Sequence, residues 1–416
     1  MRERNPTRRQ WLLAAGASGV AVLSGCISGG DGGSGDGNGS RQGENGDSGD
    51  DGSGDSGFTP WVSPYGDPQK TRSTPDPAPT DLESTTSYRV GGSVAVTDAG
   101  VFTLDRAVSR VDPSAGEIAF NRSVPVGRAL FVQDGIVVCG ERTGSGRVAG
   151  LDAETGERAW LVEPGGTVVP FPAGDGIGYA GSHIGVLDPA SGDTRWDRDR
   201  SLLSSDQPIA SYSFERVATH PESNTAFVYN DNEVLGIEAY DLTNGDVRWR
   251  QGELGGATAI PAAVRGDTVY VPQVRSGGNQ VLALDRETGE EQWRADGSLT
   301  GRNATFAVDD DSIYIANGSE FNNSASVFAL DPADGSEQWS TPVAGGTVSL
   351  IATGDALVRV GGRVELLSKT DGELQRSAEI DDTISPDAGK AVAGGRLYVP
   401  TAGIGGASGL LVYGTG

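Results

Sequence analysis

The side chains that could do chemistry in this chain are few and scattered. There are two cysteines, Cys26 and Cys139, and two histidines, His183 and His220, which are too far apart in the sequence to suggest a metal-binding or catalytic motif. No Cys-x-x-Cys-His sequence is present for haem attachment. Cys139 ends an apolar run, which predicts a buried, inert thiol. Because aspartate is too frequent for any one Asp to be singled out as a base, we predict no catalytic, cofactor-binding or metal-ligating residue.

The first 25 residues have the pattern of an export signal. Arg8 and Arg9 form a twin-arginine pair before an apolar run, which is typical of export by the Tat pathway. The sequence LSGC that ends at Cys26 resembles a lipobox, in which the cysteine becomes the lipidated first residue of the mature protein. An apolar run of about a dozen residues is short for a membrane-spanning helix. We therefore expect residues 1–25 to be a lipoprotein signal peptide and Cys26 to anchor the chain to the outer face of the cytoplasmic membrane.

Residues 26–57 consist almost wholly of Gly, Ser, Asp and Asn. Such a segment has little to bury and is typical of a flexible, charged tether. Runs rich in Asp and Gly also occur in calcium-binding loops, but no spacing here matches a defined loop of that kind. We therefore interpret this segment as a disordered acidic tether that follows the lipidated cysteine.

The chain is strongly acidic, with 57 Asp and Glu residues against 32 Lys and Arg and a formal net charge of −25. Its lysines are Lys70, Lys369 and Lys390. This composition resembles that of haloarchaeal proteins, whose carboxylates keep the fold hydrated in concentrated salt, where screening makes the self-repulsion tolerable. No basic cluster with interleaved aromatics is present. The composition therefore predicts a halophilic protein and disfavours nucleic acid as a partner.

The residues that determine the architecture belong to a repeated unit, Asp-x-x-x-Gly-x-x-x-Trp. A weaker copy lies at Asp112/Gly116/Phe120 and a degenerate one at Ser368/Gly372/Arg376. Successive copies begin 36 to 53 residues apart, a period typical of the blades of a β-propeller. The clear copies are Asp152/Gly156/Trp160, Asp188/Gly192/Trp196, Asp241/Gly245/Trp249, Asp285/Gly289/Trp293 and Asp331/Gly335/Trp339.

Each copy predicts a β-hairpin. An apolar run precedes the Asp and a second extended segment begins near the Trp, so that about four or five residues containing Gly join two strands. The Asp carboxylate is suited to accept hydrogen bonds from backbone N–H groups of the turn, and the Gly is suited to a positive φ. The Trp is left to pack against the neighbouring sheet, as expected in a propeller. A further pair of strands before each copy gives about four strands per repeat.

The repeats predict an all-β fold: an eight-bladed β-propeller of four-stranded antiparallel blades, closed by an N-terminal strand. The chain ends with an apolar run, residues 409–413, after which no turn or outer strand follows. Trp61 is a Trp without a turn before it. We expect the segment around Trp61 to supply the missing strand and close the ring, because closure removes an exposed sheet edge. Seven blades is the alternative, if the degenerate repeat and the C-terminal run belong to one blade.

Residues 284–293 (LDRETGEEQW) resemble the repeat of pyrroloquinoline-quinone (PQQ)-type propellers. Residues 61–71 (WVSPYGDPQKT) resemble a segment common in exported members of that family. The resemblance identifies residues 58–416 as a PQQ-like β-propeller. The family includes quinoprotein dehydrogenases and noncatalytic lipoproteins such as the bacterial outer-membrane assembly scaffold BamB. Because the matching residues are structural, the resemblance is specific for the fold and only weakly so for the activity.

The resemblance implies a cofactor only for the enzymes. In the alcohol dehydrogenases of the family, the quinone lies at the propeller axis beneath a disulfide between adjacent cysteines, with a calcium ion and an Asp base. This chain has no adjacent cysteines, although the glucose-oxidising members do not need them. PQQ with calcium is therefore expected only if the chain is a dehydrogenase, and otherwise we expect no cofactor.

The leading hypothesis is a noncatalytic, monomeric, lipid-anchored propeller that binds protein partners or serves as an assembly scaffold at the cell surface. It rests on the lipobox, the tether and intact structural repeats without a catalytic set, and on the loop-rich faces that propellers offer for recognition. A PQQ-dependent dehydrogenase of alcohols or sugars is the alternative. A surface sensor or binder of small ligands or glycans is a second alternative.

Overall fold

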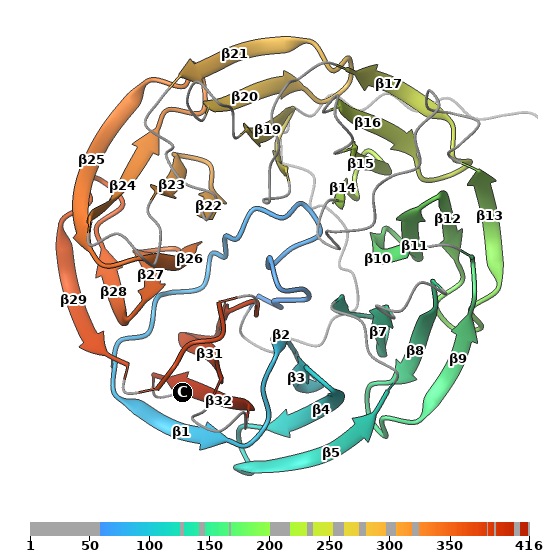
Figure 1. The fold of residues 1–416 in the computed structure, drawn as a ribbon, viewed down its shortest axis with the longest axis horizontal. Helices are drawn as coiled ribbons and strands as arrows, with labels where there is room; N and C mark the ends of the chain where they lie inside the picture. The colour runs from blue at the N-terminus through green and yellow to red at the C-terminus, as the bar shows by residue number, and fades with distance from the viewer. Residues whose placement is uncertain are drawn as a thin grey trace, which may run out of the picture. The chain divides into compact units, whose positions relative to one another are not determined.

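The structure is a computed structural model. It describes residues 59–124, 129–140, 146–165, 168–199, 217–230, 236–252, 262–273, 280–296, 305–317, 324–380, 382–386, 388–402 and 408–414. These residues form eight four-stranded antiparallel sheets arranged in a ring (Figure 1). The predicted eight-bladed, all-β propeller is confirmed. No helix long and apolar enough to cross a bilayer occurs in this part of the chain.

Each sheet, here called a blade, has its strands in order from the centre of the ring to its rim (Figure 1). Blades 1 to 4 contain β2 (Ser93–Thr97), β3 (Gly100–Leu104), β4 (Ala107–Asp112) and β5 (Glu117–Ser123); β6 (Leu130–Gln133), β7 (Ile136–Gly140), β8 (Val148–Asp152) and β9 (Arg158–Val162); β10 (Val168–Ala173), β11 (Gly176–Gly181), β12 (His183–Leu187) and β13 (Thr194–Asp199); and β14 (Val217–His220), β15 (Thr225–Asn230), β16 (Gly236–Asp241) and β17 (Val247–Gln251).

Blades 5 to 8 follow the same order, except that the rim strand of blade 8 comes from the N-terminal side of the chain. They contain β18 (Ala263–Arg265), β19 (Thr268–Gln273), β20 (Gln280–Asp285) and β21 (Glu291–Asp296); β22 (Thr305–Val308), β23 (Ile313–Asn317), β24 (Ser324–Leu330) and β25 (Glu337–Ala344); β26 (Thr347–Ala352), β27 (Leu357–Gly361), β28 (Arg363–Leu367) and β29 (Leu374–Glu379); and β30 (Ala391–Ala393), β31 (Arg396–Ala402), β32 (Ser408–Tyr413) and β1 (Ser84–Tyr88).

The repeated unit forms the turn between the third and fourth strands of a blade. At Asp152, the carboxylate Oδ1 accepts hydrogen bonds from the backbone N–H of Glu154 at 3.0 Å and of Thr155 at 2.7 Å. Gly156 donates its N–H to the Asp152 carbonyl at 2.8 Å and has a φ of +69°. Because a residue with a Cβ is strained at that φ, the unit requires Gly there. These contacts satisfy the polar groups of the turn and fix the direction in which β9 departs.

The core lies between the blades, where each sheet packs on the next. Between blades 4 and 5, the buried side chains of Phe227 and Trp249 pack with those of Val264 and Leu282. Inner strands are buried while rim strands such as β29 are largely exposed. Each sheet therefore buries its two faces against its neighbours, which is the reason for closing the ring.

An N-terminal strand closes the ring, but it is not the segment predicted from Trp61. The closing strand is β1, which pairs with β32 from Ser84↔Tyr413 to Tyr88↔Leu410. Trp61 lies instead at the inner edge of blade 1, where its backbone forms a bridge to Val96 in β2. The prediction erred because residues 62–83 first follow the centre of the ring before reaching the rim (Figure 1).

The seven-blade alternative is wrong, because the degenerate repeat and the C-terminal run lie in different sheets. Ser368 and Gly372 form the turn of blade 7, whereas the C-terminal run is β32 of blade 8. Arg376 takes the place of Trp in this repeat, and its guanidinium donates a hydrogen bond to the carbonyl of Thr80. In the clear repeats the Trp donates to a carbonyl in the turn of the following blade. Blade 8 has no such turn, and the Thr80 carbonyl is the acceptor instead.

Candidate functional site

The predicted export and lipid-attachment residues Arg8, Arg9 and Cys26 lie outside the described residues, as do the signal peptide, the tether and residue 58. Their roles stay predictions. The repeat residues and Trp61 are described, and the structure brings the repeat residues together in pairs from neighbouring blades. Each such pair packs one blade against the next.

The repeat tryptophans dock on the turn of the following blade. The indole Nε1 of Trp160 donates to the carbonyl of Pro189 at 2.7 Å, and its ring covers Gly192, where a Cβ would lie 2.9 Å from the ring. The other four clear copies repeat this contact, always with the second residue of the turn as acceptor, which follows Asp in three of them and Ser368 in the fourth. The pairs are Trp196 with Leu242, Trp249 with Arg286, Trp293 with Pro332 and Trp339 with Lys369.

Residues 61–76 form a segment, here called the strap, that follows the inner ends of the blades (Figure 1). Its backbone carbonyls accept hydrogen bonds from the innermost strands of successive blades, always from the second residue before the hairpin that ends the strand. The pairs, given as donor and acceptor, are Val96 with Trp61, Val132 with Val62, Thr219 with Pro68, Val264 with Gln69, Val308 with Thr71 and Ala352 with Arg72, at 2.7 to 3.0 Å.

Blades 3 and 8 depart from this pattern for identifiable reasons. In blade 3 the equivalent residue is Pro172, which has no N–H to donate. In blade 8 the strap uses a side chain: Asp76 Oδ2 accepts the N–H of Gly394 at 2.6 Å, and its Oδ1 accepts that of Thr59 at 2.9 Å. The strap therefore links blades on opposite sides of the ring without being part of any sheet.

The strap brings three ionisable side chains and an aromatic ring to the centre of the ring. Arg72 Cζ lies 4.4 Å and Lys70 Nζ 5.1 Å from the ring centroid of Tyr65, so two cations contact one aromatic ring. Burial lowers the pKa of Lys70 to about 8 and that of Arg72 to about 10. Burial also raises the pKa of Asp67, although Thr71 donates both its N–H and its hydroxyl to that carboxylate. This group places buried charged side chains and an aromatic ring in the strap, which bonds to the innermost strands.

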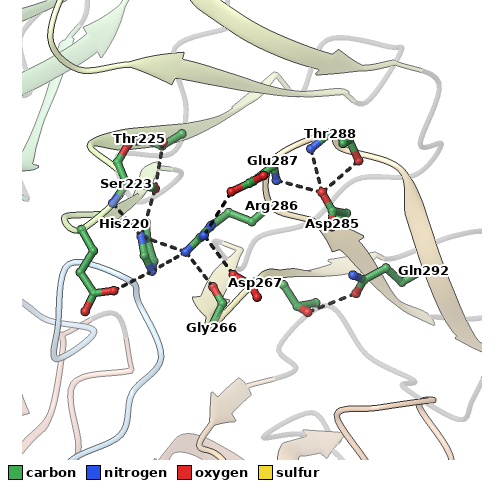
Figure 2. Close-up of polar contacts among 12 residues, drawn as sticks. His220, Ser223, Thr225, Gly266, Asp267, Asp285, Arg286, Glu287, Thr288 and Gln292 are labelled. Carbon is green, nitrogen blue, oxygen red and sulfur yellow. Dashed lines mark hydrogen bonds and ion pairs between the residues drawn. The ribbon is translucent and has the colours of Figure 1, made fainter. Parts of the chain in front are cut away.

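A second polar cluster joins blades 4 and 5 beside the strap (Figure 2). His220, only 5% exposed, has its Nε2 2.9 Å and its Nδ1 3.2 Å from Nη1 of Arg286. The same guanidinium contacts the Gly266 carbonyl at 3.1 Å and the Asp267 carboxylate at 3.0 Å. Desolvation, together with the charge of Arg286, lowers the pKa of His220. His220 is thus held neutral and is too buried to meet a substrate, so its role is to join two blades.

Further side-chain contacts tie neighbouring hairpins together at the same end of the ring, which we call the turn face. It consists of the hairpins after the innermost strands and the repeat turns, which bond to each other, as in Leu242 N–H to the Asn224 carbonyl. Arg265 pairs with Asp310 of the next blade at 2.7 Å, and Lys369 pairs with Asp309 at 2.8 Å. These contacts make the turn face a continuous, cross-linked surface.

Sequence reasoning missed both the strap and the His220–Arg286 cluster. Two signals pointed toward them: Lys70 is one of only three lysines in a strongly acidic chain, and it lies in the segment that resembles other exported propellers. The contacts themselves join residues such as Arg72 and Thr305, which are far apart in the sequence. No local pattern reveals such a pairing.

No group of three or more His, Cys, Asp or Glu side chains in the described part of the chain is placed to hold a metal ion. Tyr65, Lys70 and Arg72 belong to the strap, which lies at the inner ends of the blades.

Comparisons with solved structures show the fold. BamB from Moraxella catarrhalis is 18% identical and covers 80% of this chain and 99% of its own, with a TM-score of 0.58. Quinohemoprotein alcohol dehydrogenase from Comamonas testosteroni is 14% identical and covers 86% and 81%, with a TM-score of 0.64. The computationally designed protein Ika8 is 15% identical and covers 80% and 99%, with a TM-score of 0.60. At these identities an enzyme, an assembly factor and a designed protein share one architecture, so the likeness carries the fold alone.

Comparison with curated proteins finds no match. The sequence profile of one family, by contrast, matches residues 55–201, 230–381 and 279–412, which together span most of the chain. Its description is outer membrane protein assembly factor BamB. The matched segments include the strap and strands of every blade, although β14 and most of β15 in blade 4 lie outside them. The chain therefore belongs to the BamB family of β-propellers.

Proposed function

We propose that this protein is a noncatalytic scaffold that binds protein partners, tethered by a lipid on Cys26 to the outer face of the cytoplasmic membrane. The observation that carries the proposal is the strap, which bonds the chain's own residues to the innermost strands of the blades. Recognition then falls to the faces of the ring. Membership of the BamB family supports an assembly or binding role.

The turn face suits this role because it is rigid and studded with exposed polar groups. Interblade contacts such as Arg265–Asp310 hold adjacent hairpins in fixed positions. Exposed residues of the repeat turns, including Glu154 and Glu287, project from the same surface. A partner that docks on a preformed surface pays little for ordering it, which favours specific binding.

Photo-crosslinking tests the scaffold role. A photoreactive amino acid is introduced at Glu154 or Glu287 in the full chain, and, as the matched control, at Leu374, which is 55% exposed on the rim strand β29. We expect a discrete crosslinked protein from native membranes in high salt with the turn-face positions and none with the control. Two results together would contradict the scaffold role. They are the absence of any crosslinked or co-purified partner, and a spectral change with dye reduction on adding PQQ and calcium. They would support a dehydrogenase instead.

The anchor is tested separately. Cys26→Ser removes the proposed lipid-attachment site, so we expect the protein to leave the membrane fraction, whereas Cys139→Ser leaves it there. Replacing Arg8 and Arg9 together by Lys blocks the Tat signal, so we expect the precursor to stay in the cytoplasm. Membrane association of the Cys26→Ser protein equal to that of the wild type would refute the anchor.

A further inference from the structure

The turn glycine of blade 1 lacks the aromatic cover that every other turn glycine of the described ring has. A Cβ at Gly156, Gly192, Gly245, Gly289, Gly335 or Gly372 would lie 2.5 to 2.9 Å from an aromatic ring of the preceding blade. Gly116 has the same conformation, with a φ of +72°, yet nothing lies within 4 Å of its Cβ position. One docking position in the ring is therefore uncovered.

The register of blade 8 explains the missing aromatic. In blade 5, Tyr270 pairs with Ala283, which pairs with Trp293. In blade 8, Tyr398 pairs with Val412, which pairs with Thr86 of β1. Thr86 therefore occupies the position of the docking Trp, because the rim strand of this blade comes from outside the repeats.

A pocket of about 440 Å³ lies between blades 8 and 1, beside this docking position and against the turn residues Asp112, Pro113 and Ser114. Its lining includes Arg396 and Tyr398 of blade 8, Gly394 of the adjoining hairpin, and Arg110, Asp112 and Pro113 of blade 1. The Asp112 carboxylate is engaged by its own turn, where it accepts bonds from the N–H groups of Ser114 and Ala115. Arg396, Tyr398 and the exposed Asp98 are therefore available to meet a ligand. The Arg110 guanidinium also lines the pocket, and it donates one hydrogen bond to the Glu154 carbonyl of blade 2 at 3.2 Å.

The five docked tryptophans show which chemistry fits such a position. Each places its ring on the turn glycine and donates its indole N–H, at 2.7 to 3.0 Å, to the carbonyl of the residue after the first residue of the turn. In blade 1 that carbonyl belongs to Pro113, which lines the pocket. Tyr398 is equivalent to Tyr270, whose ring lies 6.0 Å from that of Trp293. The pocket thus presents an aromatic wall at Tyr398 and lies against Pro113, whose carbonyl is the equivalent acceptor.

We propose that the pocket between blades 8 and 1 binds a tryptophan side chain from an extended segment of a partner protein. The inference deepens the proposed scaffold function and rests on it, because it names where the partner binds and by which residue. The occupant is assigned by continuity with the other blade interfaces, where an indole fills the same place. Tryptophan is also among the residues that dominate binding energy at protein interfaces. Arg110 and Arg396 favour an acidic residue beside that tryptophan.

Peptide binding tests the proposal. The probe is a blocked peptide, Gly-Thr-Trp-Glu-Thr-Gly, with 5-fluorotryptophan as its aromatic residue, observed by ¹⁹F NMR with the full mature chain in high salt. We expect its resonance to shift and broaden on adding protein. A matched peptide with a fluorinated alanine in place of the tryptophan is expected to show no change. Equal binding of both peptides, or no binding at millimolar concentration, overturns the proposal.

A substitution of Thr86, which occupies the position of the docking Trp, gives the decisive variant. Thr86→Trp supplies the indole that the other blades have, so we expect it to weaken peptide binding by about tenfold or more, which corresponds to about 1.4 kcal/mol. Thr86→Leu fills less of the pocket and serves as the second variant, with intermediate weakening. Thr194→Trp makes the same change at an exposed position of the rim strand β13 and is expected to bind the peptide like the wild type.

The outcome also separates this inference from the scaffold function. If Thr86→Trp abolishes crosslinking of the native partner as well as peptide binding, both proposals are supported. If the native partner still crosslinks at the turn face but Thr86→Trp affects neither it nor the peptide, the scaffold stands and the tryptophan pocket is refuted.

Discussion

At the scale of single residues, the repeat tryptophans connect the local turn to the tertiary structure. Trp160 is 7% exposed and joins blade 2 to blade 3 by both packing and a hydrogen bond. Its partner Gly192 lies beneath the ring, so that a side chain at Gly192 would collide with it. The Trp of one unit therefore explains two features of the next blade: the Gly in its turn and the orientation of that turn.

Truncating a docked indole is expected to destabilise the ring. Trp160→Ala should lower the free energy of unfolding by about 3–5 kcal/mol because it leaves a cavity between two blades. Trp160→Phe keeps a ring but leaves the Pro189 carbonyl without its donor, for which we expect about 1–3 kcal/mol. Denaturant titration measures both, with Leu374→Ala on the exposed rim as the control, expected to change stability by about 0.5 kcal/mol or less. Equal effects of the two substitutions at Trp160 would contradict this account.

His220 is expected to make stability depend on pH in the mildly acidic range. Its pKa is lowered in the folded state from the ordinary value of 6.5, so the unfolded chain binds more protons as pH falls below 6.5. Stability contributed by the neutral imidazole is therefore present above 6.5 and is lost as pH falls toward the folded pKa. Melting temperatures measured from about pH 7.5 to about pH 5 should show this loss in the wild type.

The variant His220→Gln tests that assignment. Glutamine has no proton to gain, so the decline between pH 6.5 and the folded pKa should flatten. His183→Gln alters the other histidine of the chain, which is half-buried against Asp197, and serves as the matched control. A decline that persists in full in His220→Gln would assign it to other groups.

At the scale of elements, the strap is the part of the chain that the blade pattern does not contain. It carries no strand of its own, yet its carbonyls meet the innermost strands of six blades in chain order. Of the other two blades, blade 3 has a proline, Pro172, at the bonding position, and blade 8 is bonded through the Asp76 side chain. The strap therefore acts as a template along which the inner strands are aligned.

Releasing one end of the strap should increase its hydrogen exchange. Asp76 bonds the N–H groups of Thr59 and Gly394, so Asp76→Ala removes the link to blade 8 and should cost about 1.5–3 kcal/mol. Mass spectrometry after deuterium labelling should show faster exchange across residues 61–76 while the outer strands stay protected. Asp81→Ala, which removes an exposed contact to the Glu83 N–H, is the control. Unchanged exchange in Asp76→Ala would mean that the strap is held by its other contacts alone.

At the scale of the whole molecule, the net charge predicts that the stability of the ring depends on salt concentration. The formal charge of −25 on 416 residues produces self-repulsion that low salt does not screen. We expect the melting temperature to rise as KCl is increased from about 0.1 M to about 2 M, where the Debye length falls from about 10 Å to below about 3 Å. Sucrose at matched water activity is the control for solvent exclusion. A melting temperature independent of KCl would contradict the halophilic interpretation.

Particular elements show how far the sequence could be read. The turn at Asp285, Gly289 and Trp293 was predictable because its chemistry is local: a carboxylate that caps a turn, a residue that tolerates positive φ, and an aromatic left over for packing. The number of blades followed from seven such turns together with the apolar run at residues 409–413, which has no turn of its own. The closing strand was misassigned to Trp61 because Ser84–Tyr88 has no repeat signature, and only its pairing with β32 identifies it.

The sequence by itself determined the fold class, the blade count and the turn chemistry of this protein, because each depends on residues a few positions apart. The tertiary structure alone decided the path of the strap, the burial of His220 against Arg286, and the uncovered glycine at Gly116. Each of these depends on residues that closure of the ring brings together from distant parts of the chain. Closure joins a repeat to a strand outside the repeats, and the pocket proposed as a binding site lies at that junction.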